Sequence, residues 1–335
     1  MMERSRDIPP ARISGAWRRL SRALAGSLAL LGLAGCTDPQ GNGRCVIDGF
    51  GNIPILNRQG SPIVRASVNG HPVAFIVDSG SYNSTISPRS ADQLGLNANG
   101  ATGLVGGVDG PSMASVQTAR TIALGTGQAR DAAFLVADLP QARPVSGLPV
   151  VGLFGAEFML NYDIVLDQPD TTMSLLHVTG CSMPAPLWSG MMHLAPIDID
   201  GPGRNKIGVT LMVNGKRVTA ALDSGASTTT IPLDDAHRAG VTDAMLDQDV
   251  KIHVRGVGNT PITGWRHRFA TLGVGSITLN NVVLTVLPDQ DYALLGDDFL
   301  RGHRVWIPRN GNTMYIQSRA EIPANDPARK AAESP

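Results

Sequence analysis

The sequence VAFIVDSG, residues 73–80, places an aspartate directly after an apolar, strand-like run. The sequence VTAALDSG, residues 218–225, does the same 145 residues later. A carboxylate next to a strand that should be buried is unfavourable unless it is hydrogen-bonded, paired or used. The glycine allows a sharp turn and a close approach by another segment. One such triplet is weak evidence for a site, but two in matching contexts indicate a duplicated unit.

The surroundings of the two triplets repeat as well. VNGH at 68–71 corresponds to VNGK at 213–216, and a Ser/Thr-rich stretch closed by Ile-Ser-Pro or Ile-Pro follows each triplet. Further on, LFGAEF at 153–158 corresponds to LLGDDF at 294–299, now at an offset of 141. Insertions and deletions therefore lie between the motifs, where surface loops absorb them. A unit of about 110 residues is too long for a solenoid repeat, so the pattern predicts two homologous lobes.

Each half resembles a subunit of the retropepsin-like aspartic proteases. The shared pattern is an apolar run, Asp-Ser-Gly, a hairpin flap, two apolar residues with a glycine, and a short helix. Over about residues 63–317 the chain is similar to a single-chain fusion of two such lobes. The resemblance implies an all-β acid protease fold, with two β-barrel lobes related by a pseudo-twofold axis. It also implies a catalytic pair, Asp78 and Asp223, supported by Ser79, Gly80, Ser81, Ser224 and Gly225.

Two carboxylates that face each other cannot both ionise easily, so they share a proton. The ionised one takes a proton from water, and the protonated one donates to the scissile carbonyl oxygen. This chemistry needs no metal or other cofactor, and the sequence has no His-Glu-x-x-His run. The expected activity is that of an aspartic-type endopeptidase acting on an extended peptide or protein. A lipid-anchored peptide- or protein-binding module without turnover is the alternative, and a self-processing regulator that cuts one envelope partner is a third reading.

The two halves differ directly after the triplets, where Ser81 corresponds to Ala226. In the family, a hydroxyl at this position can donate to the neighbouring aspartate. We therefore expect Ser81 to favour an ionised Asp78 and to leave the proton on Asp223. The pair titrates together, so this expectation concerns microstates.

Glycine-rich segments in both halves are flap candidates. The first is GLVGGVDG at 103–110, with Gly106 and Gly107, and an ordinary loop is its alternative. The second is VRGVGN at 254–259, with Gly256 and Gly258. Trp265 follows it and either roofs a substrate pocket or packs within its hairpin.

Residues 1–36 resemble a bacterial lipoprotein signal peptide. Several arginines precede an apolar run at 23–34, which is too short for an ordinary transmembrane helix. The run ends in Leu-Ala-Gly-Cys, which resembles a lipobox with Cys36 as the lipidated first residue of the mature chain. An ordinary signal peptide is the alternative. The expected location is the bacterial cell envelope, lipid-anchored and facing the periplasm, with no clear indication of inner or outer membrane.

Two further cysteines, Cys45 and Cys181, flank the first lobe. An exported chain meets an oxidising compartment, so they form either a disulfide or two free thiols. The remaining expected boundaries are a tether at 37–59, an N-terminal lobe at 60–178, a linker at 179–206, a C-terminal lobe at 207–318 and a disordered tail at 319–335.

The charge of the chain bears on its partners. The 28 basic residues balance 28 acidic ones, but residues 1–35 hold six arginines and two acids, which leaves a mature chain of 22 basic and 26 acidic residues, a net charge of about −4. A mildly acidic surface without a basic patch argues against nucleic-acid binding. Because one chain supplies both carboxylates, we expect a monomer.

Overall fold

The structure is a computed structural model in which residues 45–107, 110–181, 187–199, 201–202, 206–255, 261–324 and 326 are described. The predicted signal peptide with Cys36, and the second flap glycines Gly256 and Gly258, lie outside these residues. Among the described helices, none is long and apolar enough to cross a membrane.

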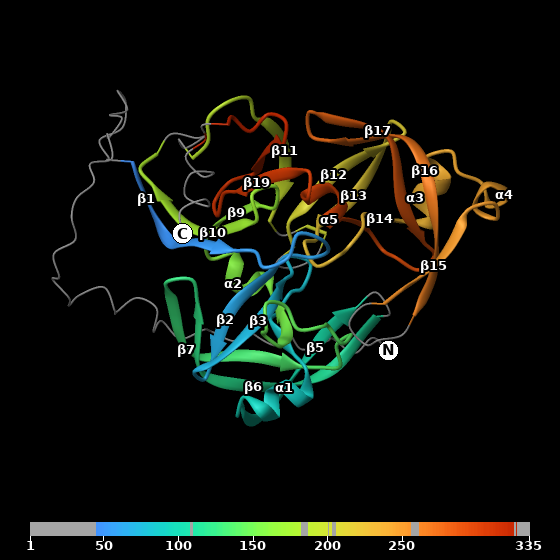
Figure 1. The fold of residues 1–335 in the computed structure, drawn as a ribbon. Helices are drawn as coiled ribbons and strands as arrows, with labels where there is room; N and C mark the ends of the chain where they lie inside the picture. Colours follow the sequence, from blue (N-terminus) through green and yellow to red (C-terminus); the bar gives the residue numbers. More distant parts are fainter. Residues whose placement is uncertain are drawn as a thin grey trace, which may run out of the picture. The chain divides into compact units, whose positions relative to one another are not determined.

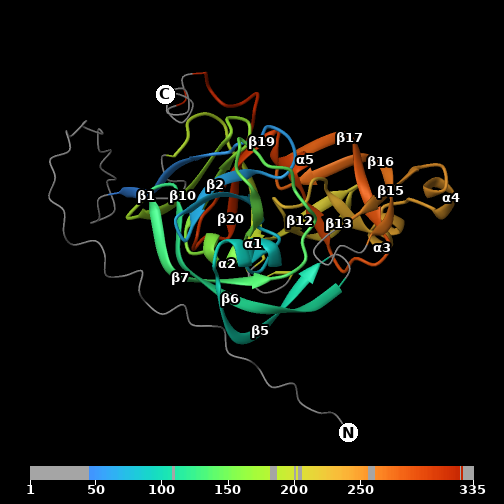
Figure 2. The same ribbon diagram turned by 60° about the horizontal axis from the view of Figure 1, so that its bottom comes forward.

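The first lobe is a seven-stranded sheet that pairs back on itself through its first strand. Asn69 and Gly70, both at positive φ, make the tight turn between the first two strands, as an Asn-Gly pair predicts. The strand order is β2 (Ile63–Val68), β3 (His71–Val77), β8 (Val150–Phe154), β4 (Thr85–Ile86), β7 (Gly127–Val136), β6 (Gly110–Leu124) and β5 (Asn97–Gly107), with an additional pairing of β2 with β6. Figure 2 shows β5 and β6 as one long hairpin.

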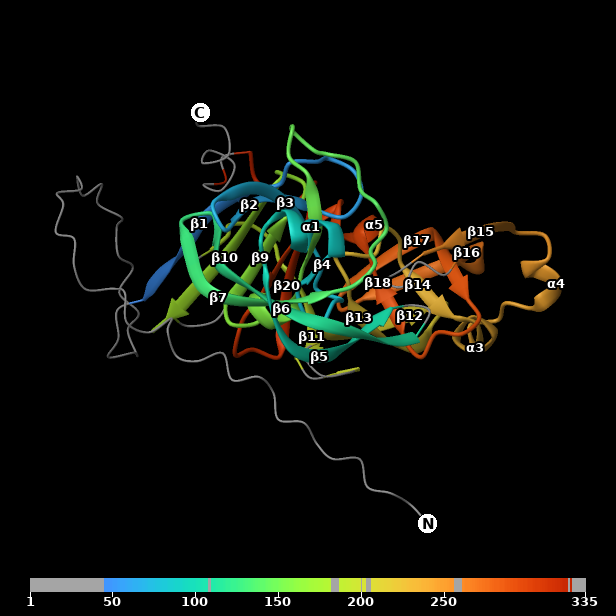
Figure 3. The same cartoon turned by 90° about the horizontal axis from the view of Figure 1, so that it is seen from below.

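The second lobe repeats this order strand for strand. It runs β12 (Gly208–Val213), β13 (Lys216–Leu222), β18 (Ala293–Leu295), β14 (Thr230–Pro232), β17 (Ile277–Leu287), β16 (Ile262–Val274) and β15 (Val250–Val254), and β12 pairs with β16. The short helices repeat too: α1 (Pro88–Gln93) and α2 (Ala156–Met159) correspond to α3 (Leu233–Arg238) and α5 (Asp297–Leu300), while α4 (Asp243–Leu246) belongs to the second lobe alone among the described elements. Figure 3 shows α3 and α4 beside the strands of this lobe. The predicted all-β fold of two homologous lobes is confirmed.

A six-stranded run of sheet joins the lobes. Its order is β1 (Val46–Pro54), β10 (Thr172–Thr179), β9 (Asp163–Asp167), β19 (His303–Ile307), β20 (Thr313–Ser318) and β11 (His193–Asp198). Figure 1 shows β9 and β19, far apart in sequence, next to each other. Val165 pairs directly with Trp306, its own equivalent at the offset of 141. The pseudo-twofold axis therefore passes between these two residues.

Three of the expected boundaries need correction. The segment 37–59 is not only a tether, because β1 pairs with β10 from Val46 opposite Thr179 to Pro54 opposite Thr172. The linker at 179–206 contains β11, which pairs with β20 and β12. The predicted disordered tail at 319–335 is ordered at Asp326, because that carboxylate is completely buried in an ion pair with Arg304. In each case the pairing partner is distant in sequence, and the local composition does not reveal it.

The cysteines flanking the first lobe form a disulfide, Cys45–Cys181, which confirms the first of the two readings. It closes the β1–β10 ladder just beyond its first pair, Val46 with Thr179. The bridge therefore fixes the outermost strand of the sheet that joins the lobes.

Candidate active site

Both aspartates follow the last residue of a buried strand, as the sequence predicts. Asp78 follows β3, and its backbone N–H donates to the carbonyl of Phe154 at 3.0 Å. Asp223 follows β13, and its N–H donates to the carbonyl of Leu295 at 2.9 Å. Phe154 and Leu295 end the parallel neighbours β8 and β18. The predicted apolar-apolar-glycine motifs thus hold the start of each triplet.

The serines of the two triplets bind the lobes together. The backbone N–H of Ser79 donates to Oγ of Ser224 at 3.0 Å, and the N–H of Ser224 donates to Oγ of Ser79 at 3.0 Å. Each hydroxyl then donates to a carbonyl across the interface, Ser79 to Leu222 at 2.9 Å and Ser224 to Val77 at 2.7 Å. All four groups are buried, so the cross-brace expected from the resemblance is present in the geometry.

The glycines of the triplets let the carboxyl groups meet. A Cβ built on Gly80 would lie 2.2 Å from Cγ of Asp223, and one on Gly225 would lie 2.4 Å from Cγ of Asp78. Each carboxyl group therefore rests against the glycine of the opposite lobe. The two carboxyl groups also lie close enough to affect each other's pKa. The structure thus brings Asp78 and Asp223 together across the lobe interface.

The two carboxylates accept equivalent hydrogen bonds from the backbone. In each lobe, Oδ1 of the aspartate accepts from the N–H groups two and three residues ahead. These bonds are 3.0 Å from Gly80 and 2.9 Å from Ser81 to Asp78, and 2.9 Å from both Gly225 and Ala226 to Asp223. Hydrogen bonds from the triplet backbone therefore do not decide which carboxyl holds the proton.

The expected role of the Ser81 hydroxyl is wrong. Its Oγ donates to the carbonyl of Asn83 at 2.9 Å, and only its backbone N–H reaches Asp78. Ala226 supplies the same N–H in the second lobe. A carbonyl two residues ahead satisfies the hydroxyl locally, so Ser81 gives Asp78 nothing that Asp223 lacks.

Burial dominates the electrostatics of the pair. Removal from water and the neighbouring Asp223 raise the pKa of Asp78 to about 8. Burial also raises the pKa of Asp223, but Lys206 is the largest influence that lowers it. Lys206 acts on Asp78 as well, where it is the weakest of the named causes. Lys206 thus acts unequally on the two carboxyl groups, whereas the Ser81 hydroxyl, which was expected to do so, reaches neither.

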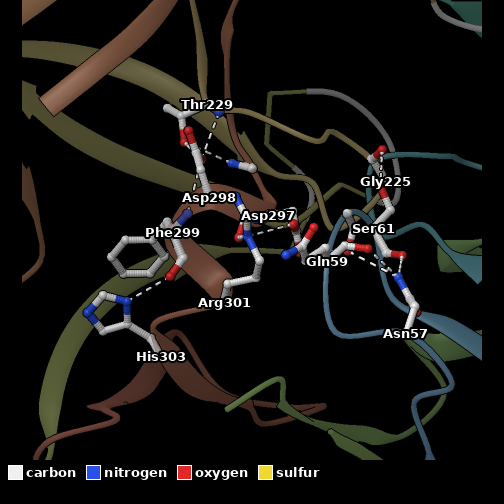
Figure 4. A network of polar contacts seen from close by, with 12 residues as sticks. Asn57, Gln59, Ser61, Gly225, Thr229, Asp297, Asp298, Phe299, Arg301 and His303 are labelled. Carbon is white, nitrogen blue, oxygen red and sulfur yellow. Dashed lines mark hydrogen bonds and ion pairs between the residues drawn. The ribbon is translucent and has the colours of Figure 1, made fainter.

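A second layer of polar groups supports each triplet, and the sequence reading did not single it out. Gly155 N–H donates to Ser84 Oγ at 2.9 Å, and in the second lobe Gly296 N–H donates to Thr229 Oγ1 at 3.1 Å. Asp298 then accepts from both the N–H and the hydroxyl of Thr229, at 2.8 and 2.6 Å, as Figure 4 shows. Ser84 and Thr229 keep the offset of 145, so an extended comparison of the halves could have found them.

One residue of each lobe also reaches across to the opposite triplet glycine. Ser61 Oγ donates to the carbonyl of Gly225 at 2.7 Å, and Figure 4 shows this pair together with Asn57, whose amide donates to Ser61. Lys206 Nζ donates to the carbonyl of Gly80 at 2.6 Å. Neither residue was expected at the site, because neither lies inside a recognised motif.

The flap predictions have mixed outcomes. Gly106 and Gly107 lie at the end of the β5–β6 hairpin, where Gly107 pairs with Gly110, so this segment is a hairpin rather than an ordinary loop. Trp265 lies in β16, is half-buried and packs against the main core, which matches the packed-hairpin alternative. Roles of these residues in substrate binding stay predictions.

Within the described residues, no group of three or more His, Cys, Asp or Glu side chains is placed to hold a metal ion. Within the same residues, the site consists of a half-buried carboxyl group on Asp78, a buried one on Asp223, the symmetric backbone donors around them and the nearby Lys206 ammonium group.

Comparisons with known proteins find aspartyl protease models in both halves of the chain. Residues 64–158 match the model of an aspartyl protease family, and residues 209–302 match that of the gag-polyprotein putative aspartyl proteases. The chain is 35% identical over 116 residues to UBA domain-containing protein Mud1 of Schizosaccharomyces pombe, a match that covers 34% of each protein. It thus spans about a third of that relative's length.

Among solved structures, an aspartic proteinase from Irpex lacteus is similar. The match covers 82% of this chain and 98% of that one, at 14% identity and a TM-score of 0.49.

Proposed function

We infer that this chain, which belongs to the retropepsin-like aspartyl proteases and carries two fused lobes, is an aspartic-type endopeptidase. The observation that supports this most is the packing of each carboxyl group, Asp78 and Asp223, against the triplet glycine of the opposite lobe, which brings the two groups together. Two carboxyl groups held close together and largely away from water share one proton, because their charges would repel strongly in this environment. Such a pair offers a base and an acid at the same point of the lobe interface.

The reaction proceeds by addition of water to the scissile carbonyl carbon. The ionised carboxylate takes a proton from water while the water oxygen bonds to that carbon. The protonated carboxyl group gives its proton to the carbonyl oxygen. The tetrahedral intermediate collapses when the carboxyl group that took the proton from water gives it to the amide nitrogen and the C–N bond breaks. The other carboxylate takes back a proton from a hydroxyl of the intermediate as the new C=O bond forms. The proton taken from water thus leaves with the new amine, and the pair returns to its starting state.

The test is cleavage of a denatured generic protein by the purified full-length chain. We expect cleavage that a statine-type inhibitor blocks, and a loss of at least about a thousand-fold in Asp78→Asn and Asp223→Asn. The exposed Asp92 supplies the matched control, because Asp92→Asn makes the same chemical change outside the site. Full activity in either site variant would contradict the proposal.

The binding-module alternative makes a different prediction for the same experiment. Wild-type protein would bind the statine-type inhibitor yet cleave no denatured substrate. A self-processing regulator would also fail this assay, but one envelope protein would accumulate in a strain carrying Asp223→Asn.

We also propose that Cys36 carries a lipid anchor, that the protein faces the periplasm and that it acts as a monomer. The disulfide Cys45–Cys181 supports export, because such bonds persist in oxidising compartments. The expected result is incorporation of labelled palmitate and membrane fractionation in the wild type, both lost in Cys36→Ser. Membrane association that survives this change would argue against lipidation at Cys36.

A further inference from the structure

The two lobes make equivalent contacts with chemically different side chains. Ser61 and Lys206 are 145 residues apart, the same offset as Asp78 and Asp223. Each reaches the carbonyl of the triplet glycine in the opposite lobe, at 2.7 Å for Ser61 and 2.6 Å for Lys206. The pseudo-twofold axis therefore relates a neutral hydroxyl to a cation.

The cation is bound to a residue that contacts both carboxyl groups, and it is the largest influence that lowers the pKa of Asp223. Lys206 binds the carbonyl of Gly80, and Gly80 is the residue against which the Asp223 carboxyl rests. The Lys206 ammonium also lies over the ring of Tyr292, 5.5 Å from its centre. These two contacts hold the ammonium at a defined place beside the dyad.

The rest of the surroundings are balanced between the two carboxyl groups. Each accepts two backbone N–H groups, and each packs against a glycine. Among the described residues, the leading charge effects on the pair come from Asp223 acting on Asp78 and from Lys206 acting on both. The difference between Ser61 and Lys206 is thus a chemical asymmetry that can determine which of the two carboxyl groups holds the shared proton.

We propose that Lys206 is a positioning residue that breaks the symmetry of the dyad, making Asp223 the base that activates water and Asp78 the acid that protonates the substrate carbonyl. This rests on the proposed peptidase function. A nearby positive charge favours the ionised form of a carboxyl group. In the reaction, the proton of water passes to Asp223 Oδ, and the proton on Asp78 passes to the carbonyl oxygen.

The experiment compares pH profiles of kcat/KM for the full-length wild type, Lys206→Met, Lys206→Arg and Ser61→Ala. Without the charge, both limbs should move to higher pH, and the acidic limb should move more, by about one pH unit. Lys206→Arg should keep the wild-type acidic limb, because the charge remains. Ser61→Ala should also keep it, because it removes the equivalent contact without removing a charge.

An acidic limb that does not move in Lys206→Met would overturn the role assigned to Lys206. An equal shift of this limb in Ser61→Ala would also overturn it, because it would show that positioning of the backbone alone is responsible. Carboxyl ¹³C NMR titration of the dyad provides a readout without turnover. If the wild type cleaves nothing, the proposed function fails. The effect of Lys206 on the dyad is still tested by the titration, in which the lower apparent pKa of the dyad must rise in Lys206→Met. Lys206→Gln replaces the Met variant in both measurements if that variant does not fold.

Discussion

Ser79 and Ser224 exchange hydrogen bonds across the lobe interface, the backbone N–H of each donating to the hydroxyl of the other at 3.0 Å. Both side chains are buried, with exposed fractions of 6% and 1%. The exchange is reciprocal, so neither lobe completes its triplet without the other. Formation of the dyad is therefore coupled to docking of the lobes.

The first prediction concerns the stability that this exchange contributes. Ser79→Ala and Ser224→Ala each leave one buried N–H and one buried carbonyl without a partner, which costs about 2–4 kcal/mol in total. Urea unfolding should show similar losses for the two variants, because the pattern is symmetric. Ser81→Ala is the control, since its half-buried hydroxyl bonds only to a local carbonyl, and we expect a loss below about 1 kcal/mol. Equal effects in all three variants would contradict the coupling.

The second prediction is that the dyad makes the protein less stable as pH rises. An unfolded aspartate ionises near pH 4, whereas burial and Asp223 raise the pKa of Asp78 to about 8 in the folded protein. Between these values the folded state holds a proton that the unfolded state has lost. The contribution is complete below about pH 4 and is lost as pH rises through 8, with a slope of at most about 1.4 kcal/mol per pH unit.

Urea unfolding from pH 4.5 to 8 measures this slope. Asp78→Asn removes the titrating group and should flatten the curve, with its largest gain over the wild type near pH 8. Asp167 and Asp297, whose pKa values burial raises to about 6, contribute in the same direction in both proteins and cancel in the difference. Parallel curves for wild type and Asp78→Asn would show that the dyad does not bind this extra proton.

The third prediction concerns the glycines of the triplets. Gly80→Ala and Gly225→Ala each place a methyl group where the opposite carboxyl lies, at 2.2 and 2.4 Å from Cγ. The carboxyl groups must move apart, and a displacement of this size costs about a hundred-fold or more in kcat. Gly302→Ala is the control, because its Cβ would make only an ordinary contact at 3.7 Å. Wild-type turnover in Gly80→Ala would mean that close approach of the carboxyls is not needed.

The sequence predicted those parts of the site that local chemistry repeats. Asp78 and Asp223 were identifiable because the same strand, turn and glycine recur at a constant offset. The Asn-Gly turns and the apolar-glycine motifs are similarly local. Features of this kind depend on neighbouring residues and are visible without a structure.

Features that depend on distant partners were missed. In β1 only Ile53 is buried, so its sequence shows no alternation, and the strand is held by β10 and the disulfide instead. Lys206 lies 126 residues from the carbonyl it binds, and its lobe-one equivalent has a different side chain. The Ser81 hydroxyl was assigned by analogy to Asp78, although a nearer acceptor was available.

The fourth prediction tests the disulfide that ties β1 to β10. Cys45 and Cys181 close a loop with a sequence separation of 136, so removal of the bridge should lower the free energy of unfolding by about 2–5 kcal/mol. A thiol reductant should lower the melting temperature of the wild type. It should leave the double variant Cys45→Ser/Cys181→Ser unchanged, which controls for other effects of the reductant. Equal melting temperatures for oxidised wild type and the double variant would indicate that β1 needs no bridge.

The last prediction concerns the C-terminal segment, which anchors in the sheet that joins the lobes. Arg304 in β19 is completely buried, and its guanidinium donates to both carboxylate oxygens of Asp326, at 2.8 and 3.2 Å. Asp167 in β9 lies 3.5 Å away, opposite Arg304 in the ladder between the lobes. The ring of Trp188 stacks on the guanidinium, 4.5 Å from its centre. The segment after β20 thus neutralises a cation at the junction of the two lobes.

Asp326→Ala removes the bidentate partner of a buried cation and should cost about 3–5 kcal/mol, because breaking a buried pair leaves its charge poorly compensated. Asp326→Asn keeps one acceptor oxygen and should cost less. The double variant Arg304→Met/Asp326→Ala removes both charges, so it should be more stable than Asp326→Ala alone. Urea unfolding of these three variants and of Arg304→Met alone separates the lost charge compensation from lost packing. A loss in the double variant equal to the sum of the single losses would show that the two side chains do not act as a pair.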